Sequence, residues 1–125
     1  SFMFRDLKRL ENLNLAMNRI KKIEKNAFFG LKNSLRRLDL RINKIDRIKY
    51  FYFEHLENLF LLSFSRNHIS TVDPFSFKYN KYLFQLSFEN NCLFKNFDSV
   101  SVLNLYYIQM LILKLNLIVE LRREN

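Results

Sequence analysis

The chain has very few of the residues that most folds use for tight turns. Its 125 residues include one glycine, Gly30, and one proline, Pro74. A sandwich or a doubly wound fold of this length needs more of both, because they set the backbone angles of tight turns. The glycine-rich loops that bind phosphates and dinucleotides are excluded for the same reason. The shortage favours a repetitive coil whose corners are held by stacking on neighbouring coils.

Cysteine and long apolar runs are scarce as well. The single cysteine, Cys92, allows no disulfide within the chain. The most apolar segment, residues 108–121, is interrupted by polar and charged residues and is shorter than the roughly 20 apolar residues of a membrane-spanning helix. The catalytic motifs G-x-S-x-G and H-E-x-x-H are missing. The sequence therefore predicts no membrane span, no catalytic or metal site and no cofactor.

One frame of apolar residues and asparagine returns five times along the chain. Residues 35–45 define it as L-x-x-L-x-L-x-x-N-x-I. The repeats start near Leu10, Leu35, Leu59, Leu83 and Ile108. The asparagines of the frame are 25, 24, 24 and 25 residues apart, and they are Asn18, Asn43, Asn67, Asn91 and Asn116. A fixed period of this length indicates a stack of similar structural units.

This frame and its period resemble the leucine-rich repeat family, and residues 26–40 resemble its typical subclass of about 24 residues per repeat. The resemblance implies an α/β-type solenoid: a right-handed coil with short parallel strands on the concave face and irregular or short-helical convex segments. We expect a single array over residues 1–125 that opens with a partial repeat at residues 1–9. We also expect the chain to be a fragment without caps.

The alternation in x-L-x-L-x predicts one short strand per repeat with a buried face, because successive side chains of a strand point to opposite faces. Strands that run in the same direction in successive repeats form a parallel sheet. The return path must close each coil from the opposite side. We expect Phe28, Phe53 and Phe77 to stack there in a column that ends at the smaller Val102.

The repeated asparagine is predicted to belong to the scaffold. Where the chain leaves each strand, buried backbone N–H and C=O groups lack a partner in the sheet. A buried carboxamide can both donate to and accept from such groups, whereas a carboxylate only accepts. The five asparagines of the frame are therefore expected to form a hydrogen-bonded ladder along the coil.

The outward side chains of the strands form the candidate binding surface. Arginines on this concave face can hold anionic or hydrogen-bonding groups, and the apolar end at Met110 and Ile112 is typical of a binding hot spot. The predicted ligand-binding residues are Asn14, Arg37, Asp39, Arg41, Ser63, Ser65, Arg66, Gln85, Ser87, Glu89, Met110, Ile112 and Lys114. The alternative for each of them is a solvated sheet face.

The resemblance implies non-enzymatic recognition of a protein partner, as in Toll-like receptors and small leucine-rich proteoglycans, and exposure outside the cell or at its surface. The charge supports an alternative, because the net charge is +9 and eleven basic residues fall between Arg19 and Lys49. Such a basic surface favours an anionic polymer such as nucleic acid or sulfated glycan. Alternatively, the lysines and arginines only cover the outside of an apolar coil and keep it solvated. A third possibility is a structural fragment that has no ligand of its own.

One pair of residues has the ingredients of a nucleophile. His68 and Cys92 each follow an asparagine of the frame, so stacking places them in one column on adjacent coils. A histidine beside a thiol can activate it. The column lies at a coil edge, however, without an evident cleft or oxyanion donors. We therefore predict neither catalysis nor metal binding there.

Overall fold

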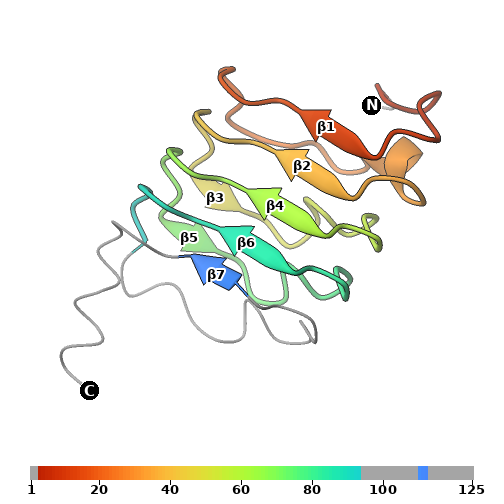
Figure 1. Cartoon of the computed structure of the whole chain (residues 1–125). Helices are drawn as coiled ribbons and strands as arrows, with labels where there is room; N and C mark the ends of the chain where they lie inside the picture. The colour runs from red at the N-terminus through yellow and green to blue at the C-terminus, as the bar shows by residue number, and fades with distance from the viewer. Residues whose placement is uncertain (1–2, 94–109, 113–125) are drawn as a thin grey trace.

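The computed structural model describes residues 3–93 and 110–112, which form a spiral with one parallel sheet along its concave side (Figure 1). The strands of this sheet are β1 (Asn12–Asn14), β2 (Arg37–Asp39), β4 (Leu61–Ser63), β6 (Gln85–Ser87) and β7 (Met110–Ile112). They lie in the order β1-β2-β4-β6-β7, and every neighbouring pair is parallel. The predicted solenoid with one strand per repeat is confirmed.

The pairing of the strands follows the sequence frame. The central residue of each strand pairs with the central residue of the next, in the series Leu13, Leu38, Leu62, Leu86 and Leu111. Because these partners are 24 or 25 residues apart, one turn of the spiral takes one repeat. The corresponding leucines of neighbouring coils therefore lie side by side, and the sheet keeps one apolar face from β1 to β6.

A second parallel sheet pairs β3 (Arg47–Ile48) with β5 (Thr71–Val72), and Figure 1 shows it behind the first sheet. Among the described residues the one helical element is the short 3-10 helix η1 (Phe29–Leu31). Irregular or short-helical segments were predicted on this side, and the second sheet was not. Ile48 and Val72 are buried, so an apolar position on successive coils aligns two short extended segments there.

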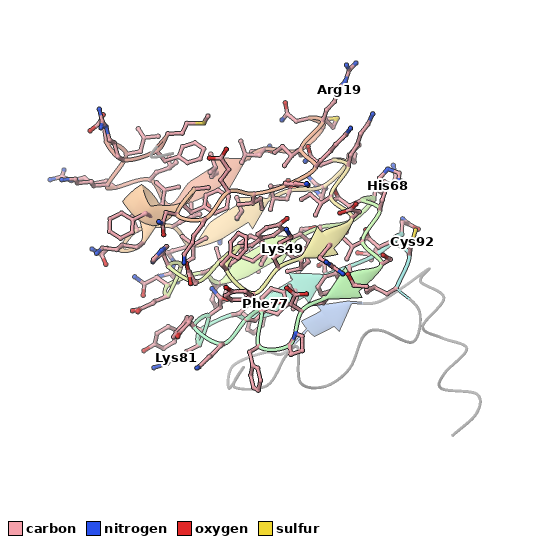
Figure 2. All side chains as sticks on the ribbon, turned by 180° about the vertical axis from the view of Figure 1, so that it is seen from behind. Arg19, Lys49, His68, Phe77, Lys81 and Cys92 are labelled. Carbon is pink, nitrogen blue, oxygen red and sulfur yellow. The ribbon has the colours of Figure 1, made fainter. Side chains whose placement is uncertain are left out.

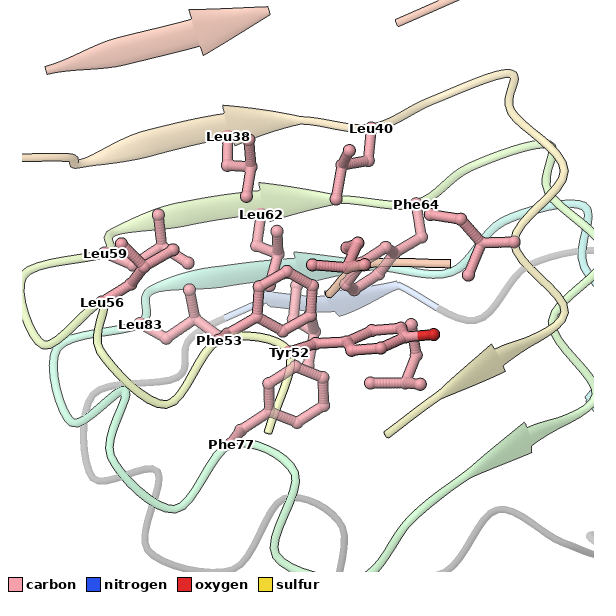
Figure 3. Close-up of a cluster of buried hydrophobic side chains, with 14 of the residues drawn as sticks. Leu38, Leu40, Tyr52, Phe53, Leu56, Leu59, Leu62, Phe64, Phe77 and Leu83 are labelled. Carbon is pink, nitrogen blue, oxygen red and sulfur yellow. The ribbon is translucent and has the colours of Figure 1, made fainter. Parts of the chain in front are cut away.

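Leucines of the strands and phenylalanines of the return path fill the interior (Figure 3). Phe53 stacks on Phe28 and on Phe77, each with ring centroids 6.2 Å apart and nearly parallel planes. Phe4 extends the column, because its ring lies 6.0 Å from that of Phe28. The predicted phenylalanine column is therefore present, while its expected end at Val102 lies outside the described residues.

The asparagines of the inner repeats connect neighbouring coils. Asn67 Nδ2 donates to the carbonyl of Phe64 in its own coil at 2.8 Å and to that of Leu40 in the preceding coil at 2.9 Å. Its Oδ1 accepts from the backbone N–H of Ile45, also in the preceding coil, at 3.0 Å. Asn43 and Asn91 are buried as well and repeat this pattern.

The first asparagine of the frame departs from the expected ladder. Asn18 is exposed, and its Nδ2 donates to the carbonyls of Leu15 and Ala16 in its own turn, at 2.9 and 3.2 Å. No strand of the described residues pairs with the other edge of β1, so a preceding coil that would bury Asn18 is not among them. The prediction of a buried carboxamide is wrong at this position. The fifth asparagine, Asn116, lies outside the described residues.

Candidate binding groove on the concave face

The outward faces of β1, β2, β4 and β6 and the turns that follow them line a groove of about 740 Å³, hereafter the concave groove. Ten of the predicted binding residues line it: Asn14, Arg37, Asp39, Arg41, Ser63, Ser65, Arg66, Gln85, Ser87 and Glu89. The leucine frame thus places side chains from four repeats on one surface. The spacing of the repeats was the signal that identified them.

The last repeat extends this surface only in part within the described residues. In the sheet Met110 pairs with Gln85, and Ile112 pairs with Ser87, so the backbone of β7 continues the concave sheet. The predicted binding residue Lys114 lies outside the described residues. The expected apolar end of the surface therefore stays a prediction.

A charged pair stands on β2 and on the turn after it. Arg41 Nη2 lies 2.7 Å from Asp39 Oδ2, and Arg41 Nε lies 2.9 Å from Asp39 Oδ1. The backbone N–H of Arg41 donates to the same Oδ1 at 3.0 Å. Partial burial raises the pKa of Asp39, but the hydrogen bonds and the charge of Arg41 outweigh it, so this pKa lies below its ordinary value. The hydrogen bond to Asp39 raises the pKa of Arg41.

The other strands carry neutral versions of this arrangement. Asn14 Oδ1 accepts from the backbone N–H of Ala16 at 2.9 Å, as Asp39 Oδ1 does from Arg41. The hydroxyls of Ser63 and Ser65 lie 3.4 Å apart. Hydrogen bonds between residues two apart thus hold the side chains of the groove in place before any ligand arrives, which lowers the entropy cost of binding.

One predicted groove residue is less accessible than expected. Ser87 was expected on a solvent-facing strand position, but only 3% of its surface is exposed. Gln85 Nε2 donates to its hydroxyl at 3.3 Å. Ser87 therefore supports Gln85 at the floor of the groove, and its small size leaves the groove its depth.

Two arginines of the groove keep their charge available. Arg37 and Arg66 are exposed, and neither guanidinium forms an ion pair within the described residues. The charge of Arg41, in contrast, is largely offset by Asp39. Because guanidinium groups bind carboxylates with paired hydrogen bonds, Arg37 and Arg66 could each hold a carboxylate.

The rim of the groove has an unusual backbone conformation that was not predicted from the sequence. The residue before each of the buried asparagines Asn43, Asn67 and Asn91 has a left-handed φ, with 56° at Ile42, 60° at Arg66 and 58° at Asn90. This region is unfavourable for residues other than glycine and asparagine, and most of all for a β-branched residue. The position directly before the repeated asparagine was the sequence signal that could have predicted this conformation. Met17 has the same conformation, with a φ of 58°, before Asn18, which bonds only within its own turn, so the conformation belongs to the turn and does not depend on bonds between coils.

The histidine and the cysteine lie where the sequence predicts. Figure 2 shows His68 and Cys92 together at one edge of the spiral, and both are exposed. Their backbone N–H groups donate to Ile45 and Ile69, the corresponding carbonyls of the preceding coils, at 2.9 and 2.8 Å. Among the described residues, no three or more histidine, cysteine, aspartate or glutamate side chains come together as a metal site would require.

A parallel sheet with one strand per repeat and asparagines between the coils defines a solenoid of short repeats. Residues 33–93 match the family model described as leucine rich repeat. The fold is similar to the crystal structure of the leucine-rich repeat domain of APL1B, with a TM-score of 0.80 and 28% identity over 85% of this chain. Residues 33–93 are therefore leucine-rich repeats, and the chain has the leucine-rich repeat fold.

A second solved structure has the same fold. The crystal structure of the LRIM1/APL1C complex matches 91% of this chain with a TM-score of 0.84 and 24% identity. The matches span 31% of the APL1B chain and 21% of the matched chain of the complex, so this chain corresponds to a minor part of each. A search of curated protein sequences finds no match. Within the described residues, no helix has the length and apolar character needed to cross a membrane.

Proposed function

We propose that this chain is a non-enzymatic recognition module that binds a protein partner in the concave groove. Leucine-rich repeat domains generally mediate protein–protein interaction, which supports this class of function. The observation that carries the proposal is the groove itself, where four repeats present internally hydrogen-bonded polar side chains. Beside them lie Arg37 and Arg66, which form no ion pair with another described residue. Such a surface is preorganised for a polar partner segment.

The size of the sheet limits what it can hold. Five strands at about 4.8 Å spacing, each about 17 Å across, give a face on the order of 350 Å². A standard protein interface buries roughly 800 Å² on each partner. We therefore propose that the concave groove takes one extended segment or loop of the partner. Acidic side chains of that partner segment would contact Arg37 and Arg66.

An anionic polymer is the competing proposal, and the exposed basic residues of the first coils support it. Arg19 and Lys44 occupy the same position in successive coils, outside the concave groove. Binding through such charges releases counterions and falls steeply as salt rises. Recognition in the groove combines the arginines with fitted polar contacts, so it should lose less affinity over the same range of salt.

The test uses photocrosslinking followed by mass spectrometry, with the crosslinker placed in the groove at Ser65. The groove variant Arg37→Ala/Arg66→Ala is compared with the control Lys22→Ala/Lys44→Ala, which removes the same number of charges from exposed positions outside the groove. We expect the groove variant to lose a crosslinked protein that the control retains. Equal loss in both variants, or crosslinks to nucleic acid or glycan alone, would rule out protein recognition in the groove.

We further propose that the module is exposed outside the cell or at its surface, following its resemblance to the typical subclass of repeats. The test is protease treatment of intact cells that express the full-length protein with an epitope tag inserted next to the repeats. Digestion of the tag without permeabilisation supports exposure. Digestion only after permeabilisation would place the module inside the cell.

A further inference from the structure

A second pocket of about 420 Å³ lies outside the concave groove, where the chain before β1 passes over η1. Figure 1 shows η1 beside these first residues. The pocket, hereafter the basic pocket, is lined by Arg5, Lys8, Phe29, Gly30, Lys32 and Asn33. None of these residues lines the concave groove, so the two sites are separate.

The single glycine of the chain builds this pocket. A Cβ atom on Gly30 would lie 2.4 Å from Cα of Arg5 and 2.5 Å from the carbonyl oxygen of Phe4, so the backbone of residues 4–5 rests directly on η1. The stacking of Phe4 on Phe28 holds this contact from the side of the core. Gly30 does not have a positive φ, so its role is this close approach, which brings Arg5 to the same pocket as Lys32.

The lining combines three positive charges with an apolar wall. Arg5, Lys8 and Lys32 contribute the charges, and no carboxylate lines the pocket. Lys32 Nζ lies 4.6 Å from the centroid of the Phe29 ring, where a cation–π contact holds it. Asp6 is a weak competitor for Arg5, because its Oδ2 lies 3.9 Å from Nε and both side chains are largely exposed.

We propose that the basic pocket binds a compact ligand that carries sulfate or phosphate ester groups. The guanidinium of Arg5 can donate two hydrogen bonds to one tetrahedral oxyanion, and the ammonium groups of Lys8 and Lys32 supply further charge. The volume falls within the range of small-molecule sites and exceeds what a bare ion fills. The ring of Phe29 and the backbone of Gly30 provide a surface for the carbon frame of such a ligand.

The experiment titrates the chain by calorimetry with three probes: a heparin disaccharide, glucose 6-phosphate and inorganic sulfate. The pocket variant is Arg5→Gln/Lys8→Gln/Lys32→Gln. The control is Lys22→Gln/Lys44→Gln/Lys81→Gln, which lowers the net charge by the same three units from +9 at exposed positions outside the pocket. A third variant, Gly30→Ala, keeps every charge and pushes residues 4–5 away from η1.

We expect the pocket variant and Gly30→Ala each to bind at least one ester probe about tenfold more weakly, and the control to stay within about threefold of wild type. Preference for the disaccharide would identify a sulfated glycan, and preference for glucose 6-phosphate a phosphorylated metabolite. Absence of binding by either ester, equal losses in pocket variant and control, or inorganic sulfate binding as tightly as the esters would overturn the proposal. If thermal unfolding shows that Gly30→Ala is not folded, the comparison of the two triple variants decides.

Discussion

The first coil and the inner coils share one sequence frame but differ in how their residues are buried. Leu62, in an inner strand, is 1% exposed, whereas Leu13, at the same place in the first strand, is only half-buried. Asn67 bridges two coils, whereas Asn18 bonds only within its own turn. The difference shows that an inner repeat obtains part of its burial, and the bridging partners of its asparagine, from the coil before it. The energy of the scaffold therefore lies largely between coils.

The largest expected effect comes from the leucines of the two regions. Leu62→Ala should lower the free energy of unfolding by about 2–5 kcal/mol, because it leaves a cavity in a closed core. Leu13→Ala should cost no more than about half of that, since part of its side chain is already in water. Urea unfolding followed by circular dichroism measures both. Equal losses would mean that the first coil is closed from its other side.

The asparagines should show the same contrast at a smaller scale. Asn67→Ala leaves the buried N–H of Ile45 without its partner and should cost about 1–3 kcal/mol. The carbonyls of Leu40 and Phe64 lose one donor each but still accept from Asn43 and Asn91. Asn18→Ala should cost less than about 1 kcal/mol, because water replaces its bonds at an exposed turn. The same unfolding measurement applies, and a larger loss at Asn18 than at Asn67 would be incompatible with a ladder between coils.

Two inner coils differ in the type of residue that adopts the left-handed conformation at the turn. Ile42 and Asn90 hold the same conformation, but only asparagine tolerates it well. Ile42→Asn should therefore raise the free energy of unfolding by about 1 kcal/mol, and Asn90→Ile should lower it by a similar amount. Melting temperatures of both variants measure the effect. A loss of stability in Ile42→Asn would show that contacts of the isoleucine side chain outweigh the strain.

The smallest effect concerns the charged pair Asp39/Arg41 on β2 and the turn after it. The corresponding side chains of β1 and β4 and of their turns are neutral. Because Arg41 lowers the pKa of Asp39 in the folded state, the pair contributes stability above the ordinary aspartate pKa of about 3.9 and loses it as the pH falls toward the lowered value. Asp39→Asn should cost about 0.2–1 kcal/mol at neutral pH and less than that at about pH 3, because the aspartate of the unfolded chain is then largely protonated. Unfolding curves at both pH values measure this, and a difference that grows on acidification would contradict it.

The fold could be predicted from the sequence because a solenoid repeats its information in every coil. Alternation around Leu38 indicates a strand, and the return of the same frame places Leu62 beside it without any knowledge of distant contacts. The same reasoning placed Asp39 and Arg66 on one surface, and both line the concave groove. The place of a residue within the repeat can be read from the local sequence, and it gives the place of that residue in its coil.

What the sequence did not reveal depends on the partner of each residue in space. The frame treats Asn18 and Asn67 alike, although only one has a described coil on its preceding side. The close approach of Arg5 to Gly30 joins segments 25 residues apart and leaves no repeated pattern, because other repeats have no glycine there. The pairing of β3 with β5 was missed for a related reason, since two residues are too few to show alternation.

Amide hydrogen exchange at Ile45 tests most directly whether each asparagine ties down the coil before it. The Ile45 N–H is bonded to Asn67 Oδ1, and the Ile20 N–H is bonded in the same way to Asn43 Oδ1. In the Asn67→Ala variant, exchange should become much faster at Ile45 while Ile20 keeps most of its protection. An unchanged rate at Ile45, or an equal rise at both amides, would show that the asparagines do not connect neighbouring coils.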